Sequence, residues 1–193
     1  MFNIDEIVGY IIRSDHDINM QDMQDTDLTH LKLQKLLYYA QGHALAELGK
    51  PLFDNDFIAW QHGPVIEKVY HDFRHNGSDL IGYEIGSQEK YDCFNLLKDK
   101  EASQLLDKTI EYYSQYSPWK LRDMIYEEEP WKNVGINIII SKESLKEFFS
   151  NNDIKERIES DLPDWEDLKG IAPNATGNLL SEEFIRNLRN EWQ

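Results

Sequence analysis

The sequence contains a single cysteine and no long run of apolar residues. Cys93 cannot form a disulfide within its 193-residue chain, which is typical of a reducing cytoplasm. The acidic and aromatic neighbours of Cys93 would not lower its thiol pKa, so we expect a structural cysteine and not a nucleophile. No segment approaches the roughly 18 apolar residues that a membrane helix requires, and the first residues lack the features of a secretory signal. We therefore expect a cytoplasmic protein with no membrane partner.

Basic residues are also scarce. The chain has 20 lysines and arginines against 36 acidic residues, which gives a formal net charge of −16. Nucleic acids are polyanions that proteins bind largely through lysine and arginine, so we do not expect a nucleic-acid partner. The surplus of acid either attracts a basic protein partner by long-range steering or only keeps the protein soluble.

Motifs for catalysis and metal binding are absent as well. The sequence has no G-x-S-x-G elbow, no Walker loop and no G-x-G-x-x-G motif. His71 and His75 lie four residues apart on an expected helix, but two ligands do not make a zinc site. The acids at 127–129 are consecutive at a helix end and therefore point in different directions. We expect no enzyme, no cofactor and no metal site.

Apolar spacing and end-capping residues predict a chain of helices. Asn3 and Glu6 form a capping box for the first helix, and Thr29 or Asp27 can cap the second. Gly49 should end the second helix in a left-handed conformation. The polar content of residues 13–27 is typical of a loop. The expected helices cover residues 4–12, 29–48, 64–75, 101–116, 118–129 and 141–149.

Prolines mark three of these boundaries. Gly63-Pro64 and Ser117-Pro118 should each begin a helix, because proline suits the first helical position, where its missing N–H would be unbonded anyway. Pro130 should stop the helix that starts at Pro118.

Extended segments are few. Residues 53–60 and 81–85 are predicted as short strands that pair with each other. After residue 150 the sequence becomes polar, with a loop expected at 171–178 and a short helix at 181–188. The predicted fold class is mainly α, formally α+β with a minor two-stranded β element. A compact helical domain would cover residues 1–150, and a C-terminal extension would cover 151–193.

Two motifs at a fixed spacing give a family resemblance. Residues 31–42 read LKLQKLLYYAQG, residues 59–65 read AWQHGPV, and further matches occur at 49–53, 69–70 and 129–131. This pattern resembles the Panacea domain family of SocA-like and GepA-like phage-associated antitoxins over about residues 4–149. Members of that family often carry a histidine five residues before the tryptophan that corresponds to Trp131, and this chain has Tyr126 at that position.

The resemblance implies a fold dominated by helices, with a small β element, and a role as antitoxin in a two-gene toxin–antitoxin pair. It implies a cognate toxin, encoded by the adjacent gene, that is bound and blocked directly. A SocA-type member acts differently, as an adaptor that delivers its toxin to the ClpXP protease, so ClpXP is an alternative partner.

Candidate partner-binding residues come from the two motifs and from the final Pro-Trp. Each has a structural alternative: the polar residues at 32–35 could be a solvated helix face, the aromatic residues could be core, and Trp131 could cover the helices. An unrecognised enzyme, the alternative from another class, would be sought around Tyr38, Trp60 and His62. The candidates are Lys32, Gln34, Lys35, Tyr38, Tyr39, Trp60, His62 and Trp131.

Overall fold

The computed structural model describes residues 1–22, 28–86 and 88–152, together with 154 and 157. The chain divides into two compact units, Met1–Asp153 and Ile154–Gln193. The loop predicted at 171–178 and the helix predicted at 181–188 lie outside the described residues, so the C-terminal extension stays a prediction. Everything that follows concerns the first unit.

The first unit is mainly helical, which confirms the predicted fold class. No helix among the described residues combines the length and apolar character needed to cross a membrane. The helices are α1 (Ile4–Asp22), α2 (His30–His43) with its π-helical continuation η1 (Ala44–Leu48), α3 (Glu67–Phe73), η2 (Arg74–Asn76), α4 (Tyr83–Gly86), η3 (Glu89–Tyr91), α5 (Phe94–Lys98), α6 (Lys100–Ser114), α7 (Pro118–Glu127), α8 (Glu129–Lys132) and α9 (Lys142–Ser150).

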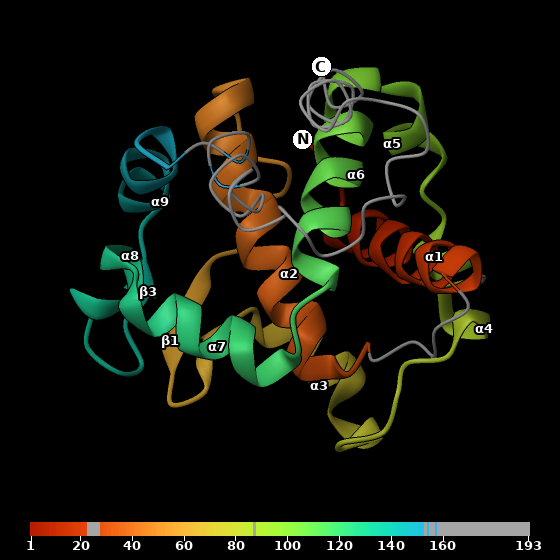
Figure 1. Cartoon of the computed structure of the whole chain (residues 1–193), viewed down its shortest axis with the longest axis horizontal. Helices are drawn as coiled ribbons and strands as arrows, with labels where there is room; N and C mark the ends of the chain where they lie inside the picture. Colours follow the sequence, from red (N-terminus) through yellow and green to blue (C-terminus); the bar gives the residue numbers. More distant parts are fainter. Residues whose placement is uncertain (23–27, 87, 153, 155–156, 158–193) are drawn as a thin grey trace, which may run out of the picture. The chain divides into compact units, whose positions relative to one another are not determined.

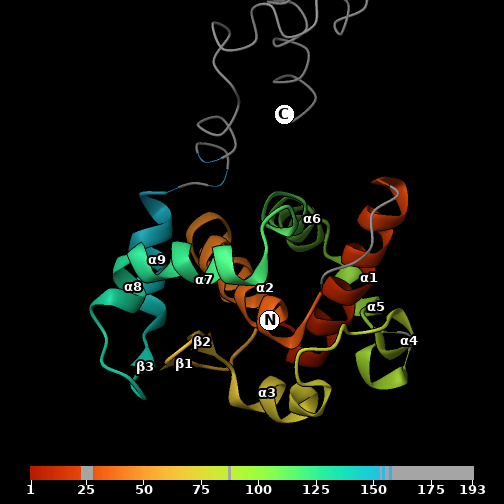
Figure 2. The same ribbon diagram turned by 60° about the horizontal axis from the view of Figure 1, so that its bottom comes forward.

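Helix α2 occupies the centre of the unit. Figures 1 and 2 show it running between α1 and α6 on one side and α8 and α9 on the other, and it contacts α1, α3, α6, α7, α9 and β2. Every residue from Lys32 to His43 is buried. A helix enclosed on all sides is normally apolar all round, so the polar residues of α2 must find partners inside the protein.

Most predicted helix ends are confirmed. Thr29 caps α2 by accepting a hydrogen bond from the Lys32 N–H at 3.3 Å, and Gly49 follows η1 with a left-handed φ of 67°. Ser117 caps α7 with Pro118 in its first turn, and Ser141 caps α9. These caps depend on neighbouring residues alone, which is why the sequence reveals them.

The predicted loop at 13–27 is wrong over its first part, because α1 continues to Asp22. Asn3 and Glu6 do form the predicted box at the start of α1, with the Asp5 N–H bound by Asn3 and the Asn3 N–H bound by Glu6. Helix α1 packs against α4, η3 and α6, and these tertiary contacts outweigh the low helix propensity of its second half.

A small antiparallel sheet has three strands in the order β2-β1-β3, one more than predicted. They are β1 (Phe57–Trp60), β2 (Gly63–Val65) and β3 (Ile139–Ile140). The expected pairing of residues 81–85 with β1 is wrong, because Tyr83–Gly86 is helical and the nearby contact is a single bridge between Thr29 and Leu80. The third strand comes from residues 139–140, which the sequence pattern did not indicate.

The prediction that Gly63-Pro64 begins a helix is also wrong. Pro64 lies in β2 opposite Ala59, and α3 begins only at Glu67. The Ala59 N–H and C=O are already bonded to Ile138 and Asn137, on the β3 side. Backbone hydrogen bonds along an antiparallel strand point alternately to the neighbour on one side and the neighbour on the other. The backbone groups of Ala59 point to β3, so the residue opposite Ala59 in β2 donates no N–H to β1, and proline fits there. Pro130 lies in α8 and not directly after α7, which ends at Glu127.

Helix α9 crosses α2 where Gly42 leaves room for an aromatic ring. A Cβ added at Gly42 would lie 2.3 Å from ring atoms of Phe149, which is completely buried. The close approach of α2 and α9 therefore requires glycine at this position.

We predict that Gly42→Ala destabilises the protein although alanine favours helices by about 1 kcal/mol over glycine. Overpacking against Phe149 should exceed that gain, so the free energy of unfolding should fall by roughly 1–2 kcal/mol. Urea unfolding measures the change, with Lys146→Ala on the exposed face of α9 as the control. A Gly42→Ala variant more stable than the wild type would contradict the close packing.

Candidate partner-binding surface

Two lysines of α2 are buried and hold the ends of neighbouring elements. The Lys32 Nζ donates to the Ser114 carbonyl at 2.7 Å, at the last residue of α6. The Lys35 Nζ donates to the Pro64 carbonyl at 3.1 Å, in β2. Neither side chain has solvent exposure, so the alternative of a solvated face is wrong for both.

Two glutamines of α2 each form hydrogen bonds to the backbone of a neighbouring segment through both the oxygen and the nitrogen of the side-chain amide. Gln34 accepts from the Ile66 N–H at 2.8 Å and donates to the Ile66 carbonyl at 3.3 Å, just before α3. Gln41 accepts from the Leu52 N–H at 2.9 Å and donates to the Phe53 carbonyl at 2.8 Å. Buried backbone groups outside regular structure need such partners, so these amides stabilise the connections on either side of β1 and β2.

The tyrosines of the motif belong to the core, as the structural alternative expected. Tyr39 stacks on Tyr113 with ring centroids 3.7 Å apart and donates to Glu128 at 3.3 Å. Tyr38 packs edge-on against Phe57 and Phe149 and is fully buried. Lys32, Gln34, Lys35 and both tyrosines are therefore buried, and their assignment to an interface stays a prediction.

The electrostatics of this interior centre on Lys35. Burial and, to a lesser extent, the nearby Arg122 guanidinium together lower the pKa of its amine to about 7. Burial and the Lys35 cation likewise lower the pKa of His30.

The other three predicted residues retain some exposure. His62 lies in the exposed turn between β1 and β2, and Trp60 and Trp131 are half-buried. Trp60 packs against Tyr70 with ring centroids 4.8 Å apart. His62 contacts one end of a row of side chains on α7 and α8, and Trp131 forms the other end of that row.

That row consists of Trp119, Arg122, Tyr126 and Trp131, and we call it the aromatic row. The Arg122 guanidinium lies 4.8 Å from the Trp119 ring and 5.4 Å from the Tyr126 ring. The Tyr126 ring stacks on Trp131 at 4.3 Å, and the Tyr126 hydroxyl donates to the Gln61 carbonyl. The residues thus touch one another in sequence along α7 and α8, and Trp119 remains 54% exposed.

The ring centroids of His62 and Trp119 lie 6.1 Å apart with the ring planes perpendicular, so the β1–β2 turn contacts the row at its far end. Sequence reasoning missed Trp119 and Arg122. The signal was present, because positions 119, 122 and 126 follow the three- and four-residue steps of one helix face, opposite the buried Leu121 and Ile125.

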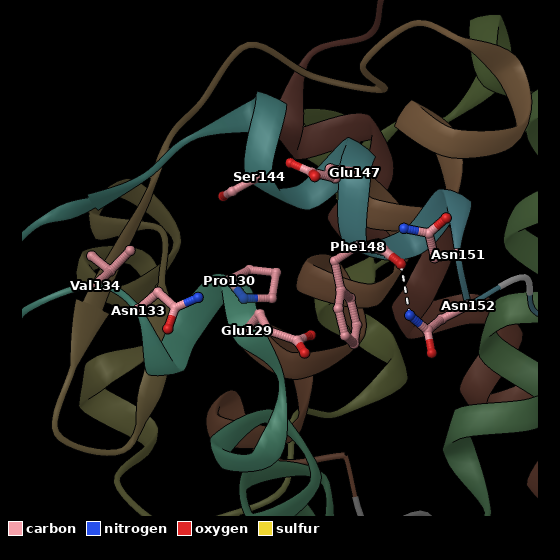
Figure 3. Close-up of a pocket in the computed structure, with 9 residues that line it drawn as sticks. All are labelled: Glu129, Pro130, Asn133, Val134, Ser144, Glu147, Phe148, Asn151 and Asn152. Atoms are coloured by element: carbon pink, nitrogen blue, oxygen red, sulfur yellow. Dashed lines mark hydrogen bonds between the residues drawn. The ribbon is translucent and has the colours of Figure 1, made fainter.

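A groove of about 430 Å³ lies between α8 and α9 (Figure 3). Pro130 from α8 and Phe148 from α9 form its apolar walls, and Glu129 and Glu147 are its charged residues. Among the described residues that line it there is no lysine or arginine. Its acidity suits a basic group better than an anion.

The structure brings no metal site together in the part of the chain that it describes, where no three histidine, cysteine or acidic side chains cluster. Cys93 is buried, which raises the pKa of its thiol, and Sγ accepts a hydrogen bond from Arg13 at 3.1 Å. Both observations fit a structural cysteine.

Comparison with known proteins identifies the family. Residues 33–132 match the family described as antitoxin SocA-like, Panacea domain, which is just over half of the chain. The chain belongs to this family. The matched segment runs from α2 to α8, so it contains the buried Gln34, Lys35 and Gln41 of α2, but not Lys32, together with the aromatic row.

Among curated proteins, the chain is similar to Antitoxin SocA of Caulobacter vibrioides (strain NA1000 / CB15N), with 46% identity over 57 residues. The match covers 30% of this chain and 30% of that protein. No solved structure matches this Panacea-domain chain.

We predict that the buried amine of Lys35 makes stability depend on pH. The ordinary lysine pKa is 10.5 and the folded value is about 7, so between these pH values the unfolded chain binds more protons than the folded one. The contribution of Lys35 to the free energy of unfolding therefore rises with pH across this window, by about 1.4 kcal/mol per unit, and is constant below it.

Urea unfolding of wild type and Lys35→Met at pH 7, 8, 9 and 10 measures this contribution as a difference. The free energy of unfolding of the wild type should rise relative to that of Lys35→Met as the pH rises. For the exposed control Lys146→Met, the difference in unfolding free energy from the wild type should stay constant. If the Lys35→Met difference is equally constant, the lysine is charged in the folded protein throughout this range.

Proposed function

We propose that this protein neutralises a toxin protein by binding it directly through the aromatic row. The observation that carries the proposal is the composition of that row, together with the exposure of Trp119 and the partial exposure of Arg122, Tyr126 and Trp131. Tryptophan, tyrosine and arginine dominate the binding energy of protein interfaces, and here they adjoin one another along α7 and α8.

The row is also held in place before any partner arrives. Trp119 is restrained by Arg122 and His62, and Tyr126 by Trp131 and the Gln61 carbonyl. Side chains that are already ordered lose little conformational entropy on binding, which favours affinity. The buried anchors of α2 fix β2 and the elements behind it, so the support beneath the row is rigid.

The charge of the chain supports a protein partner with basic surface. A net charge of −16 attracts such a partner over distance, and the same charge repels nucleic acid. Family membership and the similarity to an antitoxin point the same way. We therefore propose a non-enzymatic cytoplasmic antitoxin whose cognate toxin is encoded by the adjacent gene.

We predict that Trp119→Ala and Arg122→Ala each weaken binding to the product of the adjacent gene by at least about tenfold, the loss typical of a hot-spot residue. Calorimetry measures affinity, and co-expression measures survival of the host. Phe94→Ala is a matched control, because Phe94 on α5 is equally exposed, at 57%, and lies outside the row.

If the neighbouring product is harmless without this protein, the antitoxin function is wrong. If it is toxic and both row variants still neutralise it at wild-type affinity, the function stands and the surface is wrong. The lifetime of the toxin, followed by pulse-chase, should not depend on this protein, because delivery to a protease would shorten it.

A further inference from the structure

The outer strand of the sheet carries an unusual surface. Ile136, Ile138 and Ile139 are 52%, 57% and 54% exposed, although isoleucine is normally buried. Residues 133–141 contain no charged side chain, in a chain where 29% of residues are charged. Sheet edges are usually protected from other chains by charges, prolines or bulges that twist them away, and this edge lacks the first two.

Among the strands that the structure describes, none pairs with the outer edge of β3. The sheet order places β3 at one margin, and Figures 1 and 2 show it at the periphery of the unit. The Asn137 N–H and Ile138 C=O bond to Ala59, at 2.7 and 2.9 Å. Because such bonds alternate, Ile139, which lies opposite Ile58, turns its N–H and C=O away from β1 toward the open edge.

We propose that the toxin partner adds an extended, apolar segment to the outer edge of β3, pairing its backbone with Ile139 and packing on the exposed isoleucines. Strand addition of this kind takes affinity from backbone bonds and specificity from alternate side chains. This inference rests on the proposed function and names a second contact on the same partner.

A foreign strand suits this edge better than a second copy of the chain. Two copies would each bring a net charge of −16, so pairing through an uncharged edge would have to overcome repulsion between the remaining surfaces. Next to the edge, Asn133 and Val134 line the acidic groove with Glu129 and Glu147. A basic partner would be attracted there, and an acidic copy would be repelled.

A proline at position 139 tests backbone pairing directly. Proline lacks the outward N–H of Ile139 and leaves the bonds to β1 in place, so the sheet should tolerate it. We expect Ile139→Pro to bind the adjacent gene product about tenfold more weakly than Ile139→Ala, which removes most of the side chain and keeps the N–H. Equal binding by the two variants overturns the proposal.

Amide hydrogen exchange of the wild-type full chain gives a second readout that needs no variant. The Ile139 amide should exchange rapidly in the free protein and slowly in the complex. Protection in the free monomer would mean that the chain covers its own edge. Protection that appears with a dimer mass would mean a second copy. Either result overturns the proposal.

The two proposals fail differently. If the wild type does not bind the neighbouring product, the proposed function fails and the strand pairing fails with it. If the wild type binds and the Ile139 amide gains no protection, the strand pairing alone fails.

Discussion

The buried polar side chains of α2 are the interaction on which the rest of the first unit depends. A lysine or glutamine inside a protein is stabilised only if its donors and acceptors find partners. Gln34 and Gln41 each satisfy a donor and an acceptor of the backbone outside α2, and Lys35 donates to Pro64. These segments are irregular or short, and the anchors replace the hydrogen bonds that longer strands would supply.

This constraint determines where a partner can bind. Because α2 is enclosed, the part of the matched segment that lies in α2 is buried and supports the neighbouring elements. Gln34 and Lys35 fix the connection from β2 to α3, and β2 in turn positions the turn that carries His62. His62 contacts Trp119, so the scaffold is linked to the exposed row through one turn.

Local signals in the sequence predicted the local structure well. Caps at Thr29, Ser117 and Ser141 and the left-handed Gly49 involve neighbours in the chain, and all four are found. The errors arose where the structure of a segment depends on residues that are distant in sequence. Pro64 is in a strand because Ala59 bonds to the β3 side, and that strand lies some 75 residues away in sequence.

The candidate site shows the same division between features that neighbouring residues determine and features that only the fold determines. Burial of Lys32 and Lys35 could not be read from spacing, because a lysine flanked by leucines is equally compatible with a solvated face. The carbonyl groups that accept their hydrogen bonds belong to residues 64 and 114. These residues are distant from α2 in sequence and lie next to it only in the folded protein. The aromatic row, in contrast, has three of its four members on α7, at positions 119, 122 and 126. These positions follow helical spacing, so a search for aromatic and arginine residues at such steps would have found them.

The separation of scaffold from surface also explains how the chain can carry an exposed apolar edge. Residues 133–141 lie beyond the segment that matches the family, and they follow α8, which packs against α9. Their exposed isoleucines contribute nothing to the interior, where Ile140 alone of this strand is buried. An apolar surface that does not stabilise the fold favours aggregation unless something covers it. The surplus of negative charge opposes self-association and leaves the edge available to a partner of opposite charge.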